Sequence, residues 1–331
     1  MEIKELLPEV QENISLAQHT TFKIGGNAKY FFVAQTKDNI LKAVKAAQKC
    51  GLPFFILGGG SNILFSDNGF DGLIVKIQNP PARIATPAHS RYSVSGGQSV
   101  AGGKSKIQNN IIYAEAGVML SYLVRLTEEA GLSGLEWAAG IYGTVGGAVR
   151  GNAGAFGGQI LDVLKGVEYF DVVKDEIRQC NNRECHFDYR SSIFKENKNL
   201  IILSCEFELQ KGDKENIKEK IDKYENYRLE RHPLNYPSAG SIFKNPKLRE
   251  DIIKNYPKIA KNGFVPAGFL IEQAGLKGKI IGKAQISEKH CNFIINLGGA
   301  TAKNVLKLIG LVKKEIKNKF QIDLEEEISV I

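Results

Sequence analysis

The order of apolar and polar positions along the chain predicts a mixed α and β protein. Apolar residues three or four apart, or a charged run closed by a proline, predict helices over residues 38–50, 121–130, 214–231, 266–274 and 301–320. Short apolar or alternating runs predict strands over residues 53–57, 72–77, 111–115, 166–173, 200–209, 291–296 and 322–330. The segment 38–77 is expected to form a compact β-α-β-like unit.

Polar residues and glycines at the ends of these segments refine the predicted helices. We expect Asp38, Ser121 and Thr301 to be N-caps, because a short side-chain oxygen can accept from the open amides of a first helical turn. We expect Gly51 and Gly131 to stop the helices that precede them.

Residues 78–110 interrupt the pattern with a stretch rich in Ser, Gly, Ala and Gln, which predicts a surface insertion. The run Gly102-Gly103-Lys104-Ser105 resembles part of a phosphate loop. A P-loop also needs a glycine where the chain has Gln98, so this match fails.

Composition excludes several classes of protein. The chain has 331 residues, enough for about two domains, with 43% hydrophobic and 24% charged residues and a mean hydropathy of −0.18. These values exclude a disordered chain and a membrane bundle, and no apolar run is long enough to span a bilayer. The acidic N-terminal segment lacks a secretory signal, so we expect a cytoplasmic protein without membrane insertion.

The positive charge is concentrated in the last third of the chain. The net charge is +8, and residues 212–331 hold 22 basic and 15 acidic side chains, whereas residues 1–211 hold 22 and 21. This basic part is suited to an anionic partner, such as a phosphorylated small molecule. The sequence contains no nucleic-acid-binding module, so we expect no nucleic-acid partner.

The cysteines are odd in number, which with no secretory signal indicates reduced thiols. Cys180, Cys185 and His186 are close in sequence, but their spacing fits no standard zinc pattern. We expect them to be structural and expect no metal.

Two glycine-rich loops are candidate ligand sites. Residues 58–62 follow an apolar strand and combine glycine amides with a hydroxyl and a side-chain amide, a donor set suited to pyrophosphate. They do not form a Rossmann fingerprint, because Ile63 stands where its third glycine would be. Residues 140–158 hold eight glycines in 19 positions. Tight structural turns would also explain each loop alone; together the loops suggest a dinucleotide held at both ends.

Six ordered motifs resemble the UDP-N-acetylenolpyruvoylglucosamine reductase (MurB) family. In chain order they are His19–Gly26 followed by the loop 58–62, residues 143–157, Tyr189–Lys195, Ser238–Pro246, Gly268–Gly278, and Leu324–Ile328. The resemblance covers nearly the whole chain in the order and spacing of the family.

The resemblance implies an α+β fold: an FAD-binding fold of the vanillyl-alcohol-oxidase type in two subdomains, plus a C-terminal α/β substrate domain. We expect residues 1–77 and 78–211 to form the FAD-binding subdomains and residues 212–331 the substrate domain. It also implies noncovalent FAD, NADPH as the hydride donor, and reduction of an enolpyruvyl UDP-sugar to UDP-N-acetylmuramate for peptidoglycan synthesis. The diphosphate and carboxylate of such a substrate suit the basic C-terminal part.

The motifs also carry residue roles onto this chain. By resemblance, Arg190, Ser241 and Glu327 are catalytic: Arg190 binds the carboxylate, Ser241 donates the proton, and Glu327 is the C-terminal glutamate. The expected FAD-binding residues are Gly58, Gly59, Gly60, Ser61, Asn62, Gly143, Gly146, Gly147, Asn152, Ala153 and Gly154. The expected substrate-binding residues are Tyr189, Arg231, Asn245 and Gln273.

The chain departs from the family pattern at several points. Tyr142 stands where proline is usual, and the stretch 78–110 is longer than usual. Residues 191–231 leave no room for an extra tyrosine-bearing loop, so the chain resembles the shorter, type II branch. Two alternatives are an FAD oxidase with another substrate and a nonenzymatic module that binds an anion. We expect a monomer or a weak dimer.

Overall fold

The computed structural model describes residues 2–78, 105–249 and 263–331. The chain folds into two compact units. The first unit comprises Met1–Glu12, Tyr30–Gly59 and Gly72–Tyr227, and the second unit comprises Asn13–Lys29, Gly60–Asp71 and Arg228–Ile331. These two units do not coincide with the three ranges predicted from the sequence. The functions predicted for those three ranges stay predictions.

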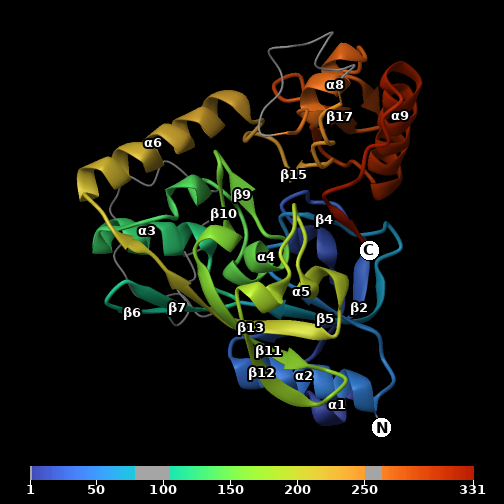
Figure 1. The fold of residues 1–331 in the computed structure, drawn as a ribbon. Helices are drawn as coiled ribbons and strands as arrows, with labels where there is room; N and C mark the ends of the chain where they lie inside the picture. Colours follow the sequence, from blue (N-terminus) through green and yellow to red (C-terminus); the bar gives the residue numbers. More distant parts are fainter. Residues whose placement is uncertain (1, 79–104, 250–262) are drawn as a thin grey trace. The chain divides into compact units, whose positions relative to one another are not determined.

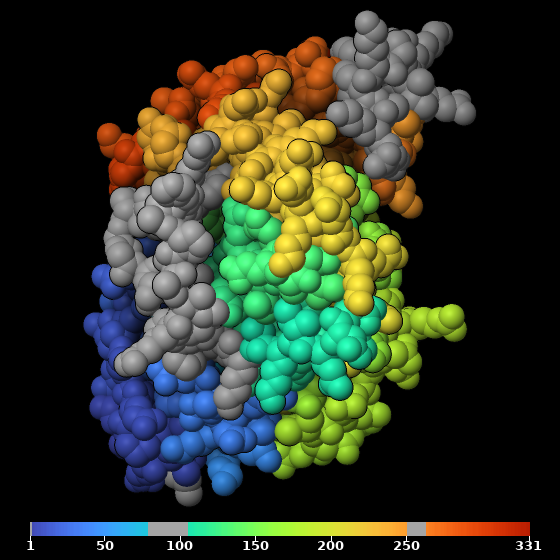
Figure 2. All heavy atoms as spheres, turned by 90° about the vertical axis from the view of Figure 1, so that its left-hand side faces the viewer, coloured from blue at the N-terminus to red at the C-terminus, as the bar shows by residue number. Residues whose placement is uncertain are grey.

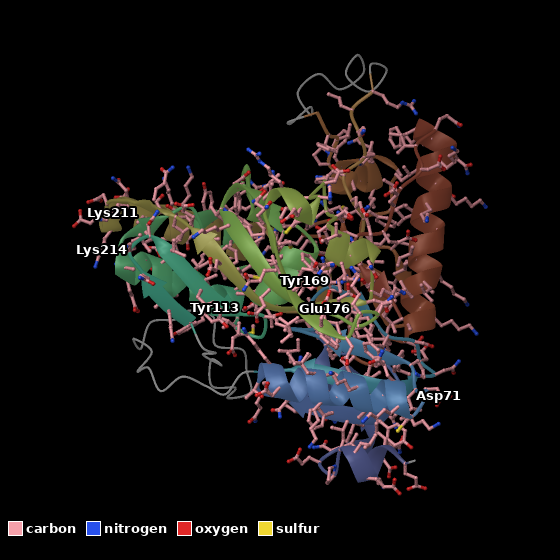
Figure 3. All side chains as sticks on the ribbon, turned by 60° about the horizontal axis from the view of Figure 1, so that its bottom comes forward. Asp71, Tyr113, Tyr169, Glu176, Lys211 and Lys214 are labelled. Carbon is pink, nitrogen blue, oxygen red and sulfur yellow. The ribbon has the colours of Figure 1, made fainter. Side chains whose placement is uncertain are left out.

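The first unit is built around a five-stranded antiparallel sheet in the order β12-β11-β13-β7-β6 (Figure 1). Tyr113, Tyr169 and Glu176 mark β7, β11 and β12 in Figure 3. The strands are β6 (Ser105–Gln108), β7 (Ile111–Glu115), β11 (Leu164–Asp171), β12 (Glu176–Asn181) and β13 (Leu200–Glu208).

Helices and short strands follow the strands of this sheet. They are α3 (Leu120–Ala130), β8 (Leu132–Ser133), α4 (Val145–Arg150), β9 (Gly154–Ala155), β10 (Gly158–Gln159), α5 (Ile193–Glu196), β14 (Gln210–Lys211) and α6 (Lys214–Arg231), with 3-10 turns η2 (Glu136–Ala138), η3 (Ile160–Asp162) and η4 (Arg183–Cys185). The apolar faces of α3 and α4 pack with this sheet into one core. An ion pair from Arg125 to Glu225 joins α3 to α6, and Figure 2 shows the yellow surface of α6 against the green surface of α3.

A second sheet has the order β1-β2-β5-β3. Its strands are β1 (Gln11–Ser15), β2 (Asn27–Ala34), β3 (Phe54–Leu57) and β5 (Phe70–Ile77), and the helices near them are α1 (Ile3–Leu6) and α2 (Lys37–Lys49). β3 and β5 are parallel, with Phe54 opposite Leu73. The predicted helix and the two predicted strands of 38–77 are present, but α2 precedes the parallel pair and does not connect its strands. The apolar face of α2 forms a core with β5 and β13.

The second unit has a four-stranded sheet in the order β15-β18-β17-β16. Its elements are η1 (Leu16–His19), β4 (Ile63–Leu64), β15 (Ser238–Ser241), α8 (Ala267–Gln273), β16 (Ile280–Ile281), β17 (Ala284–Ile286), β18 (Phe293–Asn296), α9 (Ala302–Phe320) and β19 (Ser329–Val330). The buried stripe of α9 packs on this sheet together with Phe22 and Ile24 from the N-terminal segment.

Several predicted details are wrong. Thr36, not Asp38, caps α2, since its side chain accepts from the amide of Asn39. The N-cap of α3 is Met119 and makes no side-chain hydrogen bond, so Ser121 lies inside the helix. The predicted strand 322–330 is a strand only at β19, parallel to β4, and before it makes one isolated antiparallel bridge, between Glu326 and Phe243.

The predicted insertion 78–110 lies mostly outside the described residues. In its last part, β6 pairs with β7 in a hairpin. No helix among the described residues is both long enough and apolar enough to cross a membrane. Cys180 and Cys185 are buried, with their sulfurs 3.6 Å apart.

Candidate active site

Within the first unit, the start of one glycine-rich loop, Gly58 and Gly59, lies against the other glycine-rich loop. A Cβ atom on Gly59 would lie 2.7 Å from the Cα of Gly143, and one on Gly58 would lie 2.5 Å from the hydroxyl oxygen of Thr144. Real Cβ atoms do not approach this closely, so the loops can meet only because both positions are glycine. The structure thus brings together two of the predicted FAD-binding segments.

The second loop is fixed to the turn between β7 and α3. Gly143 accepts a hydrogen bond from the amide of Leu120, and the amide of Gly146 donates to the carbonyl of Ala116. A Cβ on Gly146 would lie 2.8 Å from that of Ala116. Gly147, in contrast, is exposed. It lies in the first turn of α4, which Thr144 caps, so a ligand can reach this side of the helix.

Asn152 joins this region to the loop that carries Arg190. Its buried side-chain amide donates to the Gln159 side chain and to the carbonyl of Asp188, both at 3.1 Å, and accepts from the amide of Leu161. The side chain of Asn152 therefore makes its hydrogen bonds to groups of the protein itself. A contact with the cofactor from Asn152, Ala153 or Gly154 stays a prediction.

Arg190 is held by contacts around its backbone and its guanidinium. Its φ of 57° is in the left-handed region, which is uncommon for a residue other than glycine and frequent at functional sites. Its Nη2 donates to the carbonyl of Gly154 at 2.7 Å, its guanidinium lies 5.2 Å from the centre of the Tyr189 ring, and its carbonyl accepts from Lys195 Nζ. These contacts hold Arg190 beside the glycine-rich hairpin of β9 and β10.

In the second unit, Thr21 ties the end of the first glycine loop to β15. Its amide donates to the carbonyl of Gly60 and its hydroxyl donates to the carbonyl of Ser238 at 2.7 Å. A Cβ on Gly60, whose φ is 68°, would clash with the carbonyl oxygen of His19. Thr21, which the sequence singled out only as part of a motif, thus links the first glycine loop to the strand that carries Ser241.

Ser241 and Glu327 lie on hydrogen-bonded neighbouring segments of the second unit. Ser241 ends β15, and the next residue, Ile242, accepts from the amide of Glu327 at 2.7 Å. Asn62 donates from its side-chain amide to the carbonyl of Glu327 at 3.1 Å. The structure therefore brings Asn62, Ser241 and Glu327 together, although they are far apart in sequence.

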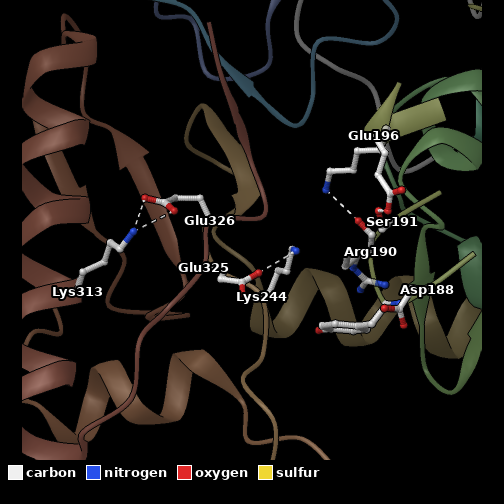
Figure 4. A network of polar contacts seen from close by, with 10 residues as sticks. Asp188, Arg190, Ser191, Glu196, Lys244, Lys313, Glu325 and Glu326 are labelled. Carbon is white, nitrogen blue, oxygen red and sulfur yellow. Dashed lines mark hydrogen bonds and ion pairs between the residues drawn. The ribbon is translucent and has the colours of Figure 1, made fainter. Parts of the chain in front are cut away.

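Lysines pair with the two acidic residues that precede Glu327. Lys244 lies 3.0 Å from Glu325, and Lys313 lies 3.0 Å from Glu326; both pairs are drawn with dashed lines in Figure 4. These pairs offset the charge of the two acidic residues beside Glu327, which is itself half-buried.

The remaining predicted substrate residues differ in their surroundings. Asn245 is half-buried, and its side-chain oxygen accepts from the amide of Ala267 at the start of α8. Gln273 ends α8 and Arg231 ends α6, and both are exposed. Their contact with substrate stays a prediction.

The glycine loops are chemically suited to FAD. Glycine backbone together with the Ser61 hydroxyl can donate hydrogen bonds to a diphosphate, and the exposed Gly147 leaves room at the second loop. That residues 58–62 and 143–147 hold the cofactor stays a prediction; the FAD would supply hydride-transfer chemistry when it is bound.

Comparison with known proteins defines the class first. Residues 28–181 match the FAD binding domain family. This range includes both glycine loops. Residues 232–331 match the C-terminal domain of UDP-N-acetylenolpyruvoylglucosamine reductase. The predicted fold class is confirmed, and the chain is an FAD-dependent oxidoreductase.

Individual relatives define the family. The chain is 38% identical to the UDP-N-acetylenolpyruvoylglucosamine reductase of Caldanaerobacter subterraneus subsp. tengcongensis, covering 99% of this chain and 96% of the relative. It is 39% identical to that of Carboxydothermus hydrogenoformans, with the same coverage. The crystal structure of the Thermus caldophilus enzyme has a TM-score of 0.71 and 30% identity, covering 97% of this chain and 98% of that one. The chain belongs to the UDP-N-acetylenolpyruvoylglucosamine reductase family.

Proposed function

We propose that Arg190, Ser241 and Glu327 carry out the reduction catalysed by this family, with NADPH as the source of electrons. The chain reduces the enolpyruvyl group of UDP-N-acetylenolpyruvoylglucosamine to give UDP-N-acetylmuramate, a peptidoglycan precursor. The observation that best supports the residue roles is the hydrogen-bonded pairing of the Ser241 and Glu327 segments.

The reaction adds a hydride and a proton across one carbon–carbon double bond. The enolpyruvyl group takes up the hydride at its methylene carbon, and negative charge then develops on the α-carbon and the carboxylate. A site for this reaction needs a cationic group aimed at the carboxylate and a proton donor at the α-carbon.

Arg190 is the proposed carboxylate partner. Its planar guanidinium can bind both carboxylate oxygens and so stabilise the developing charge. Its Nη2 bond to the Gly154 carbonyl and its contact with the Tyr189 ring fix the side chain before substrate binds, so binding orders fewer rotatable bonds.

Ser241 is the proposed proton donor to the α-carbon. A serine hydroxyl is a weak acid, but a carbanion-like centre is basic enough to take its proton, and the serine is then reprotonated from solvent. Gly240, with a φ of 75°, lets the backbone turn just before Ser241 in a way that other residues rarely allow. Glu327 either donates a hydrogen bond as a neutral acid or positions another group.

The half-reactions of a Ser241→Ala variant test this role. Because the hydroxyl acts only on the enolpyruvyl group, NADPH should reduce the flavin at an unchanged rate, and reoxidation by the enolpyruvyl UDP-sugar should fall by a factor of about 10³ or more. Ser238→Ala, in the same strand, is the control and should retain both rates. Equal loss of both half-reactions in the Ser241 variant would refute the assignment.

A further inference from the structure

Arg150 is a basic residue that the functions described above do not use. It ends α4, between the glycine loop at 143–147 and the hairpin that contacts Arg190. Its side chain is half-buried, and burial lowers the pKa of its guanidinium. Across residues 2–78, 105–249 and 263–331 it has no ion pair or side-chain hydrogen bond, whereas Arg125 pairs with both Glu128 and Glu225.

A structural role at the helix end does not explain this arginine. Basic side chains often pair with the open carbonyls of a last helical turn. In α4 these carbonyls already have other donors: Gly147 accepts from the amide of Gly151, Ala148 from that of Ala153, and Val149 from that of Asn152. The carbonyl of Arg150 itself accepts from the Ser192 hydroxyl at 2.7 Å.

The acidic residues in the neighbouring segment also have other partners. Asp188 accepts from the amide of Tyr189 at 2.7 Å, and Glu196 on α5 accepts from the hydroxyl of Ser191 at 3.1 Å. A partly desolvated cation without a counter-charge is costly to a folded protein. An anionic ligand bound next to Arg150 would remove that cost.

We propose that Arg150 is an anion-binding residue of the FAD site, whose guanidinium pairs with an anionic group of the bound cofactor. Its place in the chain supports FAD as the ligand, because Arg150 ends the short helix whose first turn is part of the glycine loop that lies against Gly58 and Gly59. Two groups of FAD have this chemistry: the diphosphate, and the isoalloxazine ring, which gains negative charge on reduction.

The test measures FAD binding to the flavin-stripped protein without substrate, so it does not depend on the proposed roles of Ser241, Arg190 or Glu327. Arg150→Met should raise the Kd for FAD at least tenfold, as expected for loss of one charge-assisted hydrogen bond. The thermal midpoint of the stripped variant should be equal to or above that of the stripped wild type, because an unpaired charge has been removed. Arg150→Lys should give an intermediate Kd, and Arg150→Gln is the substitute if the Met variant does not fold.

Arg125→Met is the matched control, because Arg125 already has two protein partners. It should lower the thermal midpoint and leave the Kd for FAD within twofold of the wild type. Two further measurements, ADP binding and the reduction potential of the bound flavin, show whether Arg150 pairs with the diphosphate or with the isoalloxazine ring. If ADP binding also weakens in the Arg150 variant, the diphosphate is the partner; if ADP binding is unchanged and the flavin potential falls, the ring is the partner. A Kd for FAD within twofold of the wild type for Arg150→Met would overturn the proposal.

Discussion

At the scale of single residues, Asn152 joins three segments through one side chain. Its amide reaches Gln159, Leu161 and the carbonyl of Asp188, two residues before Arg190. Asn152→Ala should lower the free energy of unfolding by about 1–3 kcal/mol, because the side chain of Asn152 is buried and its loss leaves the Asp188 carbonyl and the Leu161 amide without this hydrogen-bond partner. Urea unfolding followed by circular dichroism measures this loss.

The same variant should also impair turnover more than it impairs NADPH-dependent flavin reduction. Loosening the Asp188 backbone lets Arg190 sample positions away from the substrate carboxylate. The exposed Asn199 provides the control, and Asn199→Ala should change neither quantity. A turnover rate equal to that of the wild type would contradict a positioning role for Asn152.

The sequence identified candidate residues through motifs but not the contacts between them. Arg190, Ser241 and Glu327 could be assigned because local runs of residues resemble a family. The bonds from Asn152 to Asp188 and from Thr21 to Ser238 join residues that are 36 and 217 positions apart. No local periodicity encodes such pairs, and Arg150 likewise became a candidate only once its lack of a partner was visible.

At the scale of elements, one of the three N-caps predicted from the sequence is confirmed. Thr301 caps α9 as expected, in a reciprocal pair with Asn304. Asp38 and Ser121 also carry capping oxygens, but each lies one residue inside its helix. Sequence alone does not fix a helix start to one residue, and the structure has the N-caps at Thr36 and Met119 instead.

The difference between these caps gives a prediction. Thr301→Ala should lower the free energy of unfolding by about 1 kcal/mol, because the amide of Asn304 loses its acceptor. Ser121→Ala should change it by less than about 0.5 kcal/mol, because Ser121 is exposed and caps nothing. Chemical denaturation of both variants tests the assignment, and equal losses would contradict it.

A pair of histidines leads us to expect that the second unit is less stable in acid. His232 and His290 have ring centres 5.3 Å apart and pack on Phe293. Burial is the main cause that lowers the pKa of both, for His232 to about 3. The folded protein therefore holds neutral rings, so their stabilisation is full above the ordinary histidine pKa and is lost as pH falls from about 6.5 towards 3.

For His232 alone, unfolding free energy should drop by about 2 kcal/mol between pH 7.5 and pH 5. His232→Phe keeps a ring against Phe293 but cannot take a proton, so its stability should depend less on pH by that amount. The control is His186→Gln, since His186 is exposed. Urea unfolding midpoints at the two pH values measure this difference. If the pH dependence of the Phe variant equals that of the wild type, His232 does not cause the loss of stability in acid.

At the scale of the whole molecule, the two units are interleaved in sequence. Residues 13–29 and 60–71 belong to the second unit, although stretches on both sides of each belong to the first. The predicted boundaries, drawn from composition and charge, assume that neighbours in sequence share a domain. Because β4 pairs with β19 and the Asp67 carboxylate accepts from the first amides of α9, long-range contacts decide the division.

The concentration of positive charge beyond residue 211 remains consistent with an anionic UDP-sugar as the proposed ligand of the C-terminal part. A monomer or weak dimer stays a prediction, and sedimentation of the holoenzyme at several concentrations measures it. Family membership and fold followed from motifs spread over the whole chain.

Reoxidation of the reduced enzyme is the most direct test of the central claim. The flavin is first reduced without oxygen by one equivalent of NADPH in deuterated water, and the enolpyruvyl UDP-sugar is then added. We predict that absorbance near 450 nm returns and that UDP-N-acetylmuramate forms with solvent deuterium at its α-carbon. If the flavin stays reduced until oxygen is admitted, the chain is an oxidase and not the proposed reductase.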